Sequence, residues 1–109
     1  MKNLALVFSI LFFAGCASYT LITPTQTDAD RAKAENPNIT LAKLTKGKDL
    51  FQENCGKCHS LKKAFAHNTD EVVKVMPKMA KKARVNTDDA QLIQQYILTM
   101  HSAQNAQKN

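Results

Sequence analysis

The stretch that decides the fold is Gly47-Lys48-Asp49-Leu50-Phe51-Gln52-Glu53-Asn54-Cys55-Gly56-Lys57-Cys58-His59. Apolar residues in this stretch and just before it recur at helical spacing, which predicts a helix over about residues 41–54. Thr40 or Asn38 would cap the start of that helix. The stretch then ends in the pattern Cys-x-x-Cys-His. Two thiols and one imidazole are therefore expected close together at a helix end.

This pattern has a direct chemical interpretation. Two cysteines three residues apart can each form a thioether with one vinyl group of a porphyrin, and the adjacent histidine is then placed to ligate the iron. We therefore predict one haem c, attached covalently through Cys55 and Cys58, with His59 as the proximal ligand. The pattern occurs once in the chain, so one haem is expected.

Other chemistries use a Cys-x-x-Cys pair, namely redox dithiols and zinc sites. The chain has no second Cys-x-x-Cys and no His-x-x-x-His, and His67 could complete only a poor zinc set with His59. A thioredoxin-like dithiol needs a strand–helix–strand setting, which is missing from the sequence pattern. Haem is therefore the preferred interpretation, and a haem-free lipoprotein with a structural dithiol remains an alternative.

The first fifteen residues indicate a secretion signal. Met1-Lys2-Asn3 supplies a positive start, and residues 4–13 form an uncharged apolar run. Such a run spans only about 15 Å as a helix, which is too short to cross a membrane. It ends in Phe13-Ala14-Gly15-Cys16, which resembles a bacterial lipobox. We expect a lipid on Cys16; the alternative is an ordinary signal peptide with Cys16 as an incidental thiol.

Export and the cysteine count support each other. A periplasmic protein meets an oxidising environment, where a lone thiol is a liability. The chain has three cysteines. If Cys16 carries lipid, and Cys55 and Cys58 carry haem, no free thiol remains. We therefore expect a protein of the bacterial periplasm that is anchored to a membrane through lipid; the sequence does not specify the inner or the outer membrane.

The remaining sequence predicts an all-α fold with three main helices. Residues 16–40 lack a sustained apolar period and are expected to form a flexible tether. A second helix should begin after Asn68-Thr69 and kink or break at Pro77, with a short helix continuing to residue 83. The last helix should cover residues 87–102. The domain would thus span residues 41–102, followed by a disordered polar tail over residues 103–109.

A domain of about 60 residues buries too little apolar surface to be comfortably stable alone. A covalently attached haem would solve this problem, because a large flat apolar group would become the centre of the core. The small size of the domain therefore points to a cofactor independently of the cysteine motif.

The stretch from Gly47 to His59 resembles the opening of class I cytochromes c. In that family a glycine and an aromatic residue of the first helix pack against an aromatic residue of the last helix. Gly47 and Phe51 match the first pair, and Tyr96 matches the second. The resemblance covers about residues 41–102 and implies a cytochrome c-like fold around one haem, as in small lipid-anchored bacterial forms. It also explains a glycine inside a helix, which costs about 1 kcal/mol relative to alanine.

The resemblance further implies a methionine as the sixth iron ligand, supplied between the haem motif and the last helix. We expect Met79, whose distance from the last helix suits the family, with Met76 as the alternative because Met-Pro is a frequent ligand context. A thioether sulfur stabilises reduced iron and raises the potential. His67 is a rival by chemistry, but it lies only eight residues after His59, so crossing to the opposite haem face would need a tight loop.

A haem with histidine and methionine ligands leaves no open iron position. The resemblance therefore implies an electron carrier and not an enzyme. The alternative is a five-coordinate haem protein that binds small ligands or acts as a weak peroxidase. The expected interruption at Pro77 motivates this alternative, because it could leave the methionine ligand loose.

The chain is basic, with a formal net charge of +6. Most of the excess follows the haem motif and comprises Lys57, Lys62, Lys63, Lys74, Lys78, Lys81, Lys82 and Arg84. Such a face could attract an acidic redox-partner protein or an anionic membrane, or could simply be a solvated helix surface. No interleaved aromatic residues suggest nucleic-acid binding. We expect a monomer that exchanges electrons with redox-partner proteins.

Overall fold

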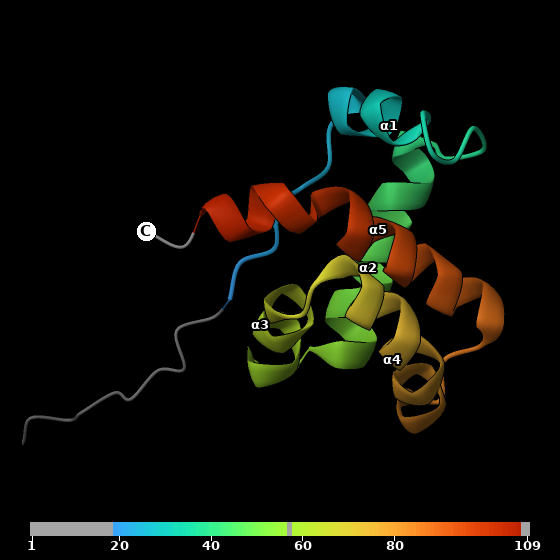
Figure 1. Ribbon diagram of the computed structural model, residues 1–109. Helices are drawn as coiled ribbons and strands as arrows, with labels where there is room; N and C mark the ends of the chain where they lie inside the picture. The colour runs from blue at the N-terminus through green and yellow to red at the C-terminus, as the bar shows by residue number, and fades with distance from the viewer. Residues whose placement is uncertain (1–18, 57, 108–109) are drawn as a thin grey trace, which may run out of the picture.

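The computed structural model describes residues 19–56 and 58–107, except for the side chains of residues 58–60. The predicted signal sequence and Cys16 lie outside the described residues. Within them the chain forms helices and no strands, which confirms the all-α fold (Figure 1). The helices are α1 (Gln26–Ala32), α2 (Leu41–Cys55), α3 (Cys58–Ala66), α4 (Thr69–Ala83) and α5 (Thr87–Ala106). None of these described helices is long and apolar enough to cross a membrane.

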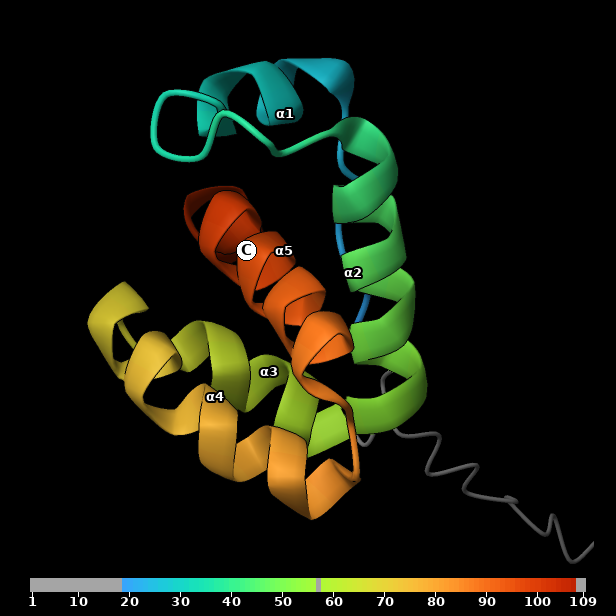
Figure 2. The ribbon, with the colours of Figure 1, turned by 90° about the vertical axis from the view of Figure 1, so that its right-hand side faces the viewer.

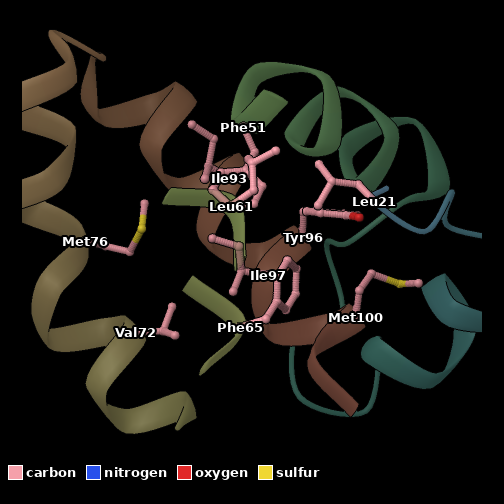
Figure 3. Close-up of a cluster of buried hydrophobic side chains, with 10 residues drawn as sticks. All are labelled: Leu21, Phe51, Leu61, Phe65, Val72, Met76, Ile93, Tyr96, Ile97 and Met100. Atoms are coloured by element: carbon pink, nitrogen blue, oxygen red, sulfur yellow. The ribbon is translucent and has the colours of Figure 1, made fainter. Parts of the chain in front are cut away.

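Helix α5 is the centre of the molecule and contacts each of the other four helices. Figure 2 shows α5 lying between α2 on one side and α4 on the other. Its buried residues include Ile93, Tyr96, Ile97 and Met100. They form the main core cluster together with residues from α2, α3, α4 and the N-terminal segment (Figure 3).

The closest helix contact is the crossing of α2 and α5 at Gly47. A Cβ atom added at Gly47 would overlap the carbonyl oxygen of Leu92 and would lie 3.1 Å from the Cβ atom of Tyr96. Next to this crossing, the rings of Phe51 and Tyr96 lie 6.4 Å apart. The expected close approach of a second helix at Gly47 is therefore confirmed.

Helix α4 begins as predicted but does not break at Pro77. The Asn68 side chain accepts a hydrogen bond from the Glu71 amide, and the Glu71 carboxylate accepts one from the Asn68 amide. The helix then continues through Pro77 to Ala83. Proline has no N–H, so the carbonyl of Val73 loses its helical partner. Val73 and Pro77 are both exposed, so water can reach this carbonyl and the interruption is tolerated.

Replacing Pro77 by alanine is expected to stabilise the folded protein by about 2 kcal/mol. The variant restores the missing backbone hydrogen bond, and alanine is favoured over proline inside a helix by about 3 kcal/mol, part of which is offset by a more flexible unfolded chain. Urea denaturation of the purified protein measures the change. Lys74→Ala, an exposed substitution on the same helix, is the control. A less stable Pro77→Ala variant would contradict this account.

Residues 19–24, here called the strap, do not form the expected flexible tether. Leu21 and Pro24 are buried, and Leu21 joins the main core cluster. After the strap, a capping box between Thr25 and Asp28 starts α1. Arg31 of α1 donates a hydrogen bond from Nη2 to the Thr99 carbonyl oxygen at 3.0 Å, which ties α1 to α5. The folded unit therefore includes residues well before position 41.

Two further features extend the folded unit. A small second core cluster consists of Ala29, Ile39 and Leu44 and joins α1 to the start of α2. At the other end, α5 continues to Ala106, so the predicted disordered tail is helical over most of its length. Gln104, within that predicted tail, is one of the most buried polar side chains, with 3% of its surface exposed. Both predicted boundaries of the domain were too narrow.

Candidate functional site

The cysteine motif lies at the junction of α2 and α3. Cys55 is the last residue of α2, Gly56 caps that helix, and α3 begins at Cys58. Cys55 and Cys58 thus mark the end of one helix and the start of the next. His59 is the second residue of α3. The side chains of Cys58 and His59 lie outside the described residues, so their predicted roles stay predictions.

A cavity of about 430 Å³ opens beside this junction. This volume falls within the range of about 300–1,000 Å³ that is typical of ligand and cofactor pockets. The wall facing α4 is formed by α2, α3 and α5 and includes Phe51, Cys55, Ile93 and Ile97. The α4 wall and the turn after it contribute Val72, Val75, Met76, Met79, Ala80, Ala83 and Val85. The cavity is therefore largely apolar and lies between the haem motif and α4.

Cys55 contributes a thiol to the wall of this cavity. Its side chain is half-buried and packs against the main core cluster. Burial raises the pKa of the Cys55 thiol, because the apolar surroundings disfavour the charged thiolate. The Cys55 side chain is thus a neutral thiol on the wall of the cavity.

Both candidate methionines line the cavity from α4. Met76 is only 9% exposed and belongs to the main core cluster. Met79, one helical turn further on, is 43% exposed and does not belong to that cluster. The structure therefore brings Cys55 and both thioether side chains to the same cavity, with the two methionines in different packing environments.

Basic side chains also line the cavity, namely those of Lys63, Lys78 and Lys82. All three residues are exposed, so their ammonium groups reach solvent. The first comes from α3 and the other two from α4. They could pair with carboxylate groups of a cofactor at the cavity mouth.

His67 lies on the cavity wall at the turn between α3 and α4. Its Nδ1 atom lies 3.1 Å from a carboxylate oxygen of Glu71. This hydrogen bond is the main reason that the pKa of the exposed Glu71 carboxyl is lowered, with the Asn68 amide as the second cause. His67 thus has a partner within its own turn, which supports a structural role over ligation.

Two side chains of α5, His101 and Asn105, support the wall of the cavity at the end of α3. His101 is half-buried, and its Nε2 atom donates to the His67 carbonyl oxygen at 2.6 Å. Asn105 donates in the same way to the carbonyl oxygen of Phe65 at 3.0 Å. These two side chains of α5 satisfy the carbonyl groups at the end of α3 and so hold one wall of the cavity. Neither residue belongs to a recognisable motif, so sequence reasoning missed them.

The residues of this cavity fit a haem. The walls are apolar, as a porphyrin face requires, while a thiol stands on one wall and two soft thioethers stand on α4. Thiol and thioether sulfurs are the donor types expected for haem attachment and haem ligation. The basic side chains at the opening match the charge of the haem propionates.

Comparison with protein families identifies the chain. The family model for Cytochrome c matches residues 44–108, which is more than half of the sequence. Comparisons with curated proteins and with solved structures found no match. The matched region contains the Cys-x-x-Cys-His motif, the α2–α5 crossing and all residues that line the cavity. The chain belongs to the cytochrome c family, whose members are electron carriers with covalently bound haem c.

Proposed function

We propose that the protein is a periplasmic one-electron carrier with a single haem c, held by Cys55 and Cys58 and ligated by His59 and Met79. One observation carries this proposal: the apolar cavity at the α2–α3 junction, onto which Cys55 and the methionines of α4 open. When bound there, haem supplies an iron that alternates between the ferric and ferrous states.

The chain's own residues have separate roles in this proposal. Cys55 and Cys58 hold the group at the helix junction, and the apolar walls exclude water from it. A dry site with a thioether ligand favours the ferrous state, because reduced iron carries less charge. The lysines at the cavity mouth neutralise the propionates and leave a basic rim.

The packing of the two methionines supports Met79 as the sixth ligand. Met76 fills space in the main core cluster, so turning it away would leave a void behind. Met79 lines the same cavity but is largely free of core packing, and its side chain can therefore turn towards an iron without such a cost. Met76 remains the alternative.

The Met79→Ala variant is expected to lose the sulfur–iron charge-transfer absorption of the ferric protein. Loss of the thioether should also lower the midpoint potential, on the order of 0.1 V within the range of about 0.8 V that axial ligands span. Optical spectra and redox titration of the purified holoprotein measure both changes.

The matched control is Met76→Ala. It should keep the charge-transfer absorption and the potential, and should instead lower the stability of the fold by about 2–5 kcal/mol, as expected for a truncated core side chain. Loss of the absorption in Met76→Ala, but not in Met79→Ala, would assign the ligand to Met76. Rapid carbon monoxide binding by the unmodified ferrous protein would contradict six-coordination altogether.

The five-coordinate alternative has lost its main support. It depended on an interruption of the helix at Pro77, whereas α4 is continuous from Thr69 to Ala83. The methionines of α4 are thus presented to the cavity by a regular helix.

We also propose that the mature protein is anchored to a membrane by lipid on Cys16 and acts as a monomer with acidic redox-partner proteins. The support for an acidic partner is the basic rim of the cavity, which is joined on α4 by the exposed Lys74 and Lys81. A positive surface around the site of electron exchange would speed the encounter with a negative partner at low salt. The lipobox-like run before Cys16 supports the anchor.

A further inference from the structure

The strap is held to α5 by three hydrogen bonds to its backbone. Gln104 accepts a hydrogen bond from the Ile22 amide at 2.8 Å and donates one to the Thr20 carbonyl oxygen at 2.9 Å. The Tyr96 hydroxyl donates to the Ile22 carbonyl oxygen at 2.7 Å. The buried side chains of Gln104 and Tyr96 thus form hydrogen bonds with backbone N–H and C=O groups of the strap, as the backbone of a neighbouring β-strand would.

Apolar contacts secure the same segment. Leu21 is 6% exposed and reaches the main core cluster, and the ring of Tyr19 lies 6.3 Å from that of Phe65 on α3. Burial raises the pKa of Tyr96, so its hydroxyl stays protonated and able to donate at physiological pH. The chain is therefore packed against the domain at Tyr19, the first residue that the structure describes.

The start of this packing limits how far the domain can move from the proposed lipid. Two residues, Ala17 and Ser18, separate Cys16 from Tyr19, and the three Cα–Cα steps between them span at most about 11 Å when fully extended. A free tether from Cys16 to Thr40 would instead have a root-mean-square length of about 27 Å and a maximum of about 80 Å. Release of the strap alone would free the chain as far as Thr25, because α1 is still held to α5, and would raise the maximum span from Cys16 to about 32 Å.

We propose that the strap seats the cytochrome c domain directly on the surface of the bilayer that holds its lipid, with the strap side facing the headgroups. This inference rests on the proposed lipidation of Cys16. The occupant of the strap side is the bilayer, because the chain between the lipid-bearing residue and Tyr19 is too short for another protein to lie between them.

Seating on the strap side leaves the proposed haem site accessible. In Figure 3, Leu21 lies at one end of the main core cluster, while Val72 and Met76 lie at the other. No strap residue lines the cavity. A partner must therefore bring its redox centre to a domain fixed at the membrane surface, since the domain itself does not swing out to meet a distant partner.

The experiment uses the full lipidated holoprotein in phosphatidylethanolamine–phosphatidylglycerol vesicles that contain a headgroup-labelled fluorescent lipid. The haem quenches this fluorophore at short range. Mass spectrometry first establishes the lipid on Cys16, so that failure of the proposed anchor is recognised separately. The unmodified protein is compared with Gln104→Ala, which removes two of the three strap hydrogen bonds. Gln91→Ala, an exposed glutamine on the same helix, is the matched control.

A second variant keeps every strap contact intact. It carries a flexible glycine–serine insertion between Ser18 and Tyr19. This variant tests the proposal even if Gln104→Ala fails to fold. We expect strong quenching for the unmodified protein and for Gln91→Ala, and loss of most of it for Gln104→Ala and for the insertion variant. Weak quenching by the lipidated unmodified protein would overturn the proposal. Equal strong quenching in all variants would also overturn it, since other contacts would then hold the domain at the bilayer.

Discussion

Replacing Gly47 by alanine is expected to destabilise the folded protein by about 2–3 kcal/mol. The added methyl group would overlap the backbone of Leu92, and a backbone carbonyl cannot turn aside as a flexible side chain can. Helices α2 and α5 must then separate, which loosens the contact between Phe51 and Tyr96. The loss of folding stability is expected even though alanine is the better helix former by about 1 kcal/mol. Urea denaturation of the holoprotein measures it.

Lys46→Ala is the matched control for this variant. Lys46 is the preceding residue of α2 and is exposed, so its truncation should change the free energy of unfolding by less than about 0.5 kcal/mol. A Gly47→Ala protein as stable as the unmodified one would show that the two helices do not approach closely at this point.

Replacing Cys55 by serine is expected to have a large effect on the covalent attachment of haem. Serine cannot form a thioether with a vinyl group, so only the thioether of Cys58 can hold the haem, and the variant should carry less attached haem, with one vinyl group unreacted. Molecules without haem would lack the group that fills the cavity between α4 and the helix junction, and their thermal stability should fall sharply. Mass spectrometry after denaturation and extraction with acidified organic solvent distinguishes attached haem from free haem.

Cys16→Ser is the matched control, because it also removes one cysteine but lies outside the family match. It should keep the full haem content and the spectrum of the unmodified protein, while losing the lipid and remaining in the soluble fraction. If the attached haem of Cys55→Ser had no unreacted vinyl group in its pyridine haemochrome spectrum, Cys55 would not be an attachment residue. If Cys16→Ser stayed with the membrane, the anchor would lie elsewhere.

Local sequence signals predicted α2, which carries Cys55, and α4, which carries the two candidate methionines. Thr40, Asn68 and Asn86 cap α2, α4 and α5, because each side chain accepts a hydrogen bond from an amide three residues later. The close contact at Gly47 was also predictable, since a glycine inside a helix is costly unless a neighbour needs the space. These features depend on residues within one or two helical turns.

Three features of the fold escaped this reasoning. Helix α3 is short and follows the cysteine motif directly, so its apolar pattern merges with the motif. Helix α1 has only seven residues, too few for a clear period. The continuity of α4 through Pro77 also went against the local rule, because solvent on the exposed side satisfies the carbonyl that proline leaves without a partner.

The sequence by itself determined the Cys55, Cys58 and His59 motif, the all-α class, and the capped starts of α2, α4 and α5, since all of these depend on residues close together in the chain. Only the tertiary structure decided that residues 19–24 belong to the folded domain and that Met76 is packed while Met79 is free. Gln104 meets Thr20 across 84 positions of sequence, and such a contact leaves no periodic trace in either segment. Burial of single polar side chains is a property of the assembled helices, and it becomes visible only when their surfaces meet.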